Sequence, residues 1–151
     1  MSPVVVTRPY PPHPGQCQAI LGDEIIATHH WEFDSFKFSD LKQTRELMEL
    51  LYMVPPMYHV NRKTWPLRRE AILKHLALGG PLHRQLATAP LIRFTWLSKD
   101  RLVQRSTFQT PQGEVSITVN FGDALQADCP PQSAMVTGSI SAPERCYRAA
   151  N

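Results

Sequence analysis

The chain has few cysteines and no long apolar run. Its three cysteines, Cys17, Cys129 and Cys146, form no C-x-x-C pair, so the common zinc-finger spacings are excluded. A Cys129–Cys146 disulfide and two free thiols are equally compatible with the sequence. No stretch approaches 18 consecutive apolar residues, so we predict no membrane span and expect no membrane partner.

The sequence also lacks a strong charge of either sign and the usual catalytic motifs. Its formal net charge is only +3, which gives no reason to expect a nucleic-acid partner. If nucleic acid did bind, the contact would involve the densest basic run, which consists of Arg62, Lys63, Arg68 and Arg69. H-E-x-x-H, G-x-S-x-G and glycine-rich phosphate loops are absent, so we predict no metal site, no cofactor and no catalytic serine. The first residues lack a secretory pattern, and the cellular location stays open.

Helical periodicity dominates the centre of the chain. A helix is predicted from Ser39 or Asp40, with a stop at Pro55. A second helix is predicted from about Thr64 or Pro66 to Leu78, with the glycines at 79–80 as its end and one or two further turns as an option for 81–87. Ahead of both helices, residues 24–30 (EIIATHH) are typical of a strand buried on both faces.

From Pro90 onward the period becomes strand-like. Strands are predicted at 92–98, 101–108, 115–121 and 133–140, with a turn at 109–114. The fold class is therefore α+β. We divide the chain into a proline-rich arm (1–16), a strand-and-two-helix unit (17–89), an antiparallel β portion (90–142) and a tail (143–151).

The front strand has no neighbour in sequence until residue 90. Parallel strands need a crossover and cover on both faces, so the front half resembles the last strand–helix step of a larger barrel. On this interpretation the chain is an incomplete fold on its own: the final step of a (β/α)₈ barrel followed by a small β-sandwich or meander.

Three stretches carry a family resemblance. They are IIATHHWEFDSFKF (25–38), LLYMVPPMYHVNRKTW (50–65) and WLSKDRLVQRSTFQTPQGEVSITVNFGD (96–123). Together they resemble the C-terminal part of endo-α-N-acetylgalactosaminidase-like glycoside hydrolases and their relatives. The resemblance implies a final barrel strand, its helix and the start of a C-terminal β-sandwich. A complete barrel takes about 250 residues, so the strands that carry the catalytic carboxylates in that family are not in this chain.

The resemblance also implies a substrate site. Active sites of (β/α)₈ barrels lie at the C-terminal ends of the strands, which would place five substrate-binding candidates there: His29, His30, Trp31, Glu32 and Asp34. Sugars stack on aromatic rings and accept hydrogen bonds from fixed polar groups. The competing interpretation makes Trp31 a core residue and leaves one histidine in solvent. Neighbouring residues on a strand face opposite sides, so both histidines can line one pocket only if the strand has ended.

These features predict a C-terminal hydrolase fragment that is catalytically inactive alone and contributes part of a sugar site. Carbohydrate is the expected ligand, with self-association or a missing upstream barrel as the expected protein contact. The alternative is a stand-alone carbohydrate-binding or protein-interaction module. The first helix distinguishes the fragment from the module. A fragment would leave Leu47, Leu50 and Val54 as an exposed patch, whereas a self-sufficient module would bury them.

Overall fold

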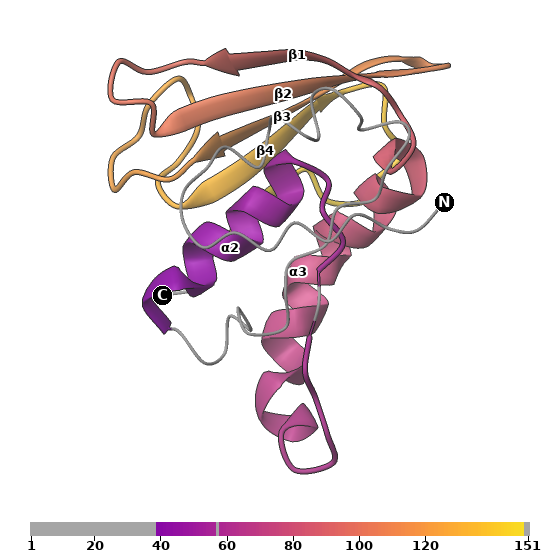
Figure 1. Cartoon of the computed structure of the whole chain (residues 1–151), viewed down its shortest axis with the longest axis vertical. Helices are drawn as coiled ribbons and strands as arrows, with labels where there is room; N and C mark the ends of the chain where they lie inside the picture. The colour runs from indigo at the N-terminus through magenta and orange to yellow at the C-terminus, as the bar shows by residue number, and fades with distance from the viewer. Residues whose placement is uncertain (1–38, 57, 150–151) are drawn as a thin grey trace, which may run out of the picture.

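The computed structural model describes residues 39–56 and 58–149 of the 151. Within these ranges the chain forms two helices, α2 (Ser39–Leu51) and α3 (Trp65–Leu86), followed by one antiparallel sheet. Figure 1 shows α2 beneath the sheet, with α3 beside it and running away from it. The α+β class is confirmed. The predicted strand at 24–30 lies outside the described residues, so the barrel interpretation stays a prediction.

Helix α2 ends as the sequence predicts, before Pro55. Two apolar stripes run along it and just past its end, one with Leu47, Leu50 and Val54 and the other with Leu51 and Tyr52. Leu47, Leu50 and Val54 are almost fully buried, as is Leu51 on the other stripe. A fragment was expected to leave the first three exposed, whereas in the described structure they are buried. Burying a leucine contributes about 1.5–3 kcal/mol, so these contacts anchor α2 firmly to the sheet.

Helix α3 runs through the expected stop at 79–80 and ends only at Leu86. Gly79 is buried where α2 passes, and a Cβ at this position would lie 3.6 Å from Leu50. Pro81 costs the helix about 3 kcal/mol through its missing N–H and its ring. Burial of Leu82 and Leu86 offsets this cost at about 1.5–3 kcal/mol each. Tertiary packing has overridden the local helix-breaking signals.

The five strands form a simple meander, in the order β1-β2-β3-β4-β5. Their bounds are β1 (Leu91–Trp96), β2 (Val103–Thr110), β3 (Gly113–Asn120), β4 (Ser133–Gly138) and β5 (Cys146–Arg148). The first four match the predicted strands closely. β5 was not predicted: it lies in the segment assigned to the tail and pairs with β4 through Tyr147 and Ala134. The described residues form this single sheet, so the meander is confirmed and no second sandwich layer is present among them.

One face of the sheet supplies the core. Val115, Ile117 and Val119 of β3 lie on the side that faces α2 and are fully buried, as their alternation predicts. Phe108 of β2 stands opposite Val115 on the same face. Two residues before Phe108 on β2, Ser106 donates a 2.6 Å hydrogen bond to the carbonyl of Leu51 and so ties the end of α2 to the sheet.

The opposite face is polar and is partly covered by the loop between β3 and β4. Asn120 donates hydrogen bonds to the carbonyls of Ala124 (2.8 Å) and Cys129 (2.9 Å), which holds this loop over the sheet. Both described cysteines are free thiols, with Cys129 buried and Cys146 exposed. The sequence left open a Cys129–Cys146 disulfide or two free thiols, and the structure has the free thiols.

Candidate functional site

The five predicted substrate residues, 29–32 and 34, lie outside the described residues. Their assignment to a sugar site therefore stays a prediction. Within the described ranges, three other groupings of side chains qualify as candidate sites: a buried polar cluster, an aromatic row and a surface hollow.

The buried polar cluster joins α2, α3 and β5. Tyr147 of β5 donates a hydrogen bond to Glu46, and the Arg45 guanidinium pairs with Glu49 at 2.8 Å. The two glutamates lie three positions apart on α2, and each is only 2% exposed. A buried charge is tolerated only when it is paired and hydrogen-bonded, and these contacts meet that requirement.

His75 completes the cluster from α3. Its Nδ1 shares a hydrogen bond with the hydroxyl of Tyr58 and lies 3.9 Å from Glu49 Oε2. Its ring also packs against that of Tyr147, with the centroids 5.2 Å apart. The Nε2 atom is buried and has no hydrogen-bond partner within the described part of the chain.

Burial controls the protonation of this cluster. It lowers the pKa of His75 below 6.5, although Glu49 acts in the opposite direction, so the imidazole is neutral at pH 7. Burial likewise raises the pKa of Tyr147, with the Glu46 carboxylate adding to the effect. The pKa of Tyr58 is also raised, by burial first and by the nearby Glu49 second. All three groups therefore stay neutral around the two carboxylates.

The cluster cannot perform glycoside hydrolysis as it stands. That reaction needs two carboxyl groups flanking a sugar, one of them able to give its proton to the leaving group. Glu46 and Glu49 are closed off from solvent and already hold Tyr147 and Arg45. Their role in this structure is to fix α2 against α3 and β5. Among residues 39–56 and 58–149, no group of histidines, cysteines and acids is arranged to hold a metal ion.

An aromatic row runs along edge strand β1. Tyr52 stacks on Phe94, with centroids 5.8 Å apart, and Phe94 meets Trp96 edge-on at 5.6 Å. The Trp96 side chain is 46% exposed, but the Arg101 guanidinium lies over its ring at 5.2 Å. A stacking sugar needs an open ring face, and Arg101 competes for this one.

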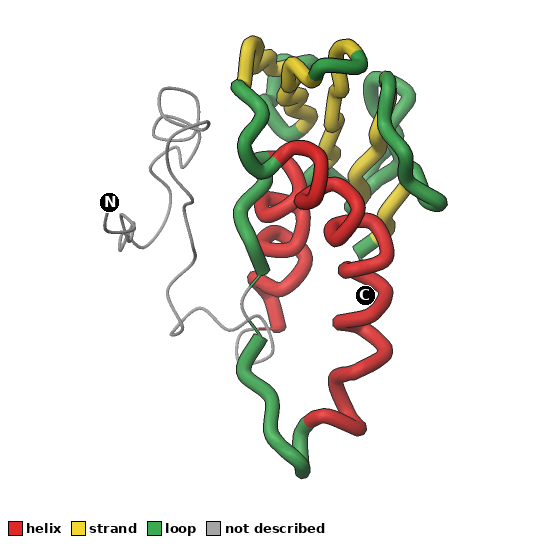
Figure 2. The backbone as a smooth tube through the Cα atoms, turned by 90° about the vertical axis from the view of Figure 1, so that its right-hand side faces the viewer, coloured by secondary structure: helices red, strands yellow, loops and turns green. Residues whose placement is uncertain are grey.

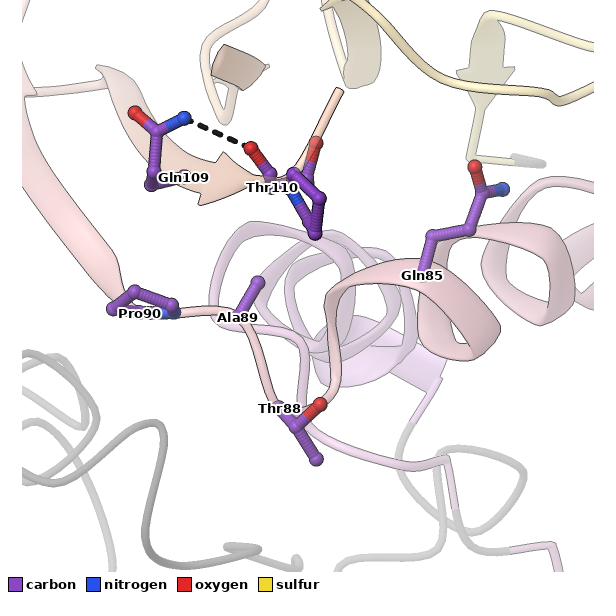
Figure 3. Close-up of a pocket in the computed structure, with 7 residues that line it drawn as sticks. Gln85, Thr88, Ala89, Pro90, Gln109 and Thr110 are labelled. Carbon is purple, nitrogen blue, oxygen red and sulfur yellow. Dashed lines mark hydrogen bonds between the residues drawn. The ribbon is translucent and has the colours of Figure 1, made fainter. Parts of the chain in front are cut away.

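A surface hollow of about 460 Å³ lies where the end of α3 meets the turn between β2 and β3. Figure 3 shows Gln85, Thr88 and Pro90 on one side and Gln109 with Thr110 on the other. The polar groups here serve the fold: Gln85 donates a 2.8 Å bond to the Ser141 carbonyl, and Gln109 donates to that of Thr110. The lining contains no aromatic ring, carboxylate or histidine, so it offers neither sugar stacking nor acid–base chemistry.

Sequence reasoning missed the polar cluster. Its signal lies in α2: where a helix has two apolar stripes, the residues between them are buried as well, and Glu46 and Glu49 occupy such positions. No local pattern, however, connects them with His75 or with Tyr147, which is 101 residues from Glu46. That pairing depends on β5, a three-residue strand without a clear alternation.

A comparison with protein families identifies the family of this chain. Residues 15–107 match the family described as glycosyl hydrolases related to GH101 family, GH129. The match spans well over half of the 151 residues, and the chain therefore belongs to this glycoside hydrolase family. No curated protein matches the sequence. No described helix is long and apolar enough to cross a membrane.

Proposed function

We propose that this chain acts as the C-terminal part of a glycoside hydrolase, where it contributes a barrel-closing strand and one wall of a sugar site. Family membership carries the proposal, because the matched region includes the whole THHWEFD stretch, residues 28–34. An aromatic ring flanked by imidazoles and carboxylates suits a sugar, which offers one apolar face and several hydroxyls. The resemblance to endo-α-N-acetylgalactosaminidase-like enzymes points to N-acetylgalactosamine as the first sugar to test.

On this proposal the chain is catalytically inactive alone. The described carboxylates that lie close together, Glu46 and Glu49, are buried and committed to structural contacts. Hydrolysis with retention would require two accessible carboxyl groups about 5–5.5 Å apart across a sugar. The nucleophile and the acid would then come from barrel strands outside this chain.

The experiment combines turnover and binding on the purified chain. We expect no release of aryl alcohol from α- or β-linked aryl glycosides, N-acetylgalactosaminides included. Calorimetric titration should show N-acetylgalactosamine binding that Trp31→Ala abolishes and Trp65→Ala, a matched change at an exposed tryptophan, leaves intact. Turnover above the buffer rate would refute the claim of inactivity. Equal binding of N-acetylgalactosamine by both variants would refute the assignment of Trp31 to the sugar site.

A second candidate is a stand-alone carbohydrate-binding or protein-interaction module. The observation that favours it is the burial of Leu47, Leu50 and Val54, which an excised fragment would have exposed. Thermal unfolding separates the candidates. A cooperative transition from a monomer that binds little apolar dye supports the module, whereas a broad transition with self-association supports a fragment that needs its barrel.

A further inference from the structure

The N-terminal end of α3 projects from the body of the protein. Figures 1 and 2 show this end of the helix and the loop before it extending past α2, on the side away from the sheet. We call residues 59–69 (HVNRKTWPLRR) the cationic tip. Nearly all of its residues are exposed, so it is available to a partner surface.

Charge in the tip has one sign. It contains four basic side chains, Arg62, Lys63, Arg68 and Arg69. No aspartate or glutamate occurs between Glu49 and Glu70. The four positive charges exceed the formal net charge of +3 for the whole chain, so this small surface holds the positive excess of the protein. The complementary surface is anionic.

Large apolar side chains stand among these charges. Leu67 is 84% exposed, Val60 42% and Trp65 41%. Burying a leucine side chain contributes about 1.5–3 kcal/mol of free energy, which an almost fully exposed Leu67 does not gain within this protein. The tip would gain it by inserting Leu67 into an apolar environment. Tryptophan and leucine beside lysine and arginine are the side chains that interfacial segments place at the headgroup boundary of a membrane.

Hydrogen bonds hold the tip in shape. Asn61 Oδ1 accepts bonds from the backbone N–H groups of Lys63 (2.9 Å) and Thr64 (3.0 Å). The Trp65 N–H donates to the Asn61 carbonyl at 2.8 Å. Arg68 donates to the His59 carbonyl at 2.6 Å, which closes the loop onto the helix. A tip fixed in this way loses little conformational entropy when it docks.

We propose that the cationic tip binds the surface of an anionic lipid bilayer, with Trp65 and Leu67 entering the headgroup boundary and Arg62 and Lys63 contacting lipid phosphates or carboxylates. The expectation of no membrane partner rested on the lack of a spanning segment, and peripheral binding needs no such segment. Nucleic acid fits less well: Trp65 offers it a stacking ring, but the most exposed apolar side chain, Leu67, offers it neither charge nor a ring. The proposal does not depend on the sugar site.

The test is sedimentation of the full chain with vesicles of phosphatidylcholine, with and without phosphatidylserine. We expect binding only to the anionic vesicles and its loss at high salt. Each basic residue near such a surface contributes about 1 kcal/mol, so Arg62→Ser with Lys63→Ser should weaken binding on the order of 30-fold. Leu67→Ser should weaken binding without changing its salt dependence. The matched control, Lys99→Ser with Leu125→Ser, removes an exposed charge and an exposed leucine elsewhere and should have no effect.

Three results would overturn the proposal. The first is no sedimentation with anionic vesicles at low salt. The second is equal loss of binding in the control variant. The third is tighter binding to a single-stranded oligonucleotide that depends on Arg62 and Lys63 but not on Leu67, which would assign the tip to nucleic acid. Circular dichroism of each variant checks that a loss of binding is not a loss of folding.

Discussion

The hydrogen bond between Tyr147 and Glu46 connects the last described strand to the first described helix, and its removal should weaken the whole fold. Tyr147→Phe deletes the hydroxyl and leaves the ring, which packs against His75 and lies under Lys74. Glu46 would then stay buried without one of its donors.

The size of the effect follows from the charge of the acceptor. A hydrogen bond to a charged group contributes about 1.5–3 kcal/mol, and Glu46 is only 2% exposed, so we expect Tyr147→Phe to destabilise the chain by about 2 kcal/mol. Tyr52→Phe is the matched control: its hydroxyl makes a 3.4 Å bond to the neutral amide of Gln104, and its loss should cost less than about 1 kcal/mol.

Urea unfolding of both variants measures these differences. In a Glu46→Gln background, the same Tyr147→Phe change should cost only about 1 kcal/mol, because the bond is then neutral. If Tyr147→Phe destabilises the chain no more than Tyr52→Phe does, or by the same amount in the Glu46→Gln background, the assignment of a hydrogen bond from Tyr147 to a buried Glu46 carboxylate is wrong.

Three further predictions concern pH, backbone and thiols. Burial lowers the folded-state pKa of His75 and His83 below 6.5, so the unfolded chain takes up protons first. Stability should be flat between about pH 7 and pH 8 and should fall below about pH 6.5, by at most about 1.4 kcal/mol per pH unit for each histidine. Urea unfolding across this range checks the prediction, and His75→Gln should reduce the slope; a flat profile would contradict it. Gly138→Ala should lower the free energy of unfolding by about 3 kcal/mol or more, because φ is +104° and a Cβ would lie 2.1 Å from the Glu114 carbonyl oxygen. Gly80→Ala in α3 is the control and should leave the free energy of unfolding unchanged or raise it, as measured by urea unfolding of both variants. An alkylating reagent should label exposed Cys146 before Cys129, because Cys129 is buried and that burial raises the pKa of its thiol; equal labelling rates of these two cysteines in the native chain would argue against this core.

Local pattern was enough to predict most of the described fold. Strict alternation at Val115, Ile117 and Val119 predicted both the strand and the face that it buries. Pro55 stopped α2 as expected, because a proline ring cannot follow a continuing helical turn. The two helices and four of the five strands depend on such short-range signals, and they are where the sequence and the structure agree.

The failures have a common physical cause, which is long-range packing. The glycines at 79–80 are helix-ending residues by propensity, yet Gly79 is buried in α3, where a Cβ would lie 3.6 Å from the Leu50 side chain of α2. Strand β5 is too short to show a period, and its pairing with β4 creates the partner for Glu46. Such contacts depend on elements far apart in sequence, so no window of neighbouring residues contains the information.

The central claim is that this chain contributes a sugar-binding wall to a glycoside hydrolase. The most direct test is a two-dimensional NMR titration that follows the indole N–H signals of the three tryptophans, Trp31, Trp65 and Trp96, each assigned by its phenylalanine variant. We expect N-acetylgalactosamine to shift the Trp31 signal saturably and to leave the signals of Trp65 and Trp96 in place. No shift at Trp31, or a saturable shift at Trp96 instead, would contradict it.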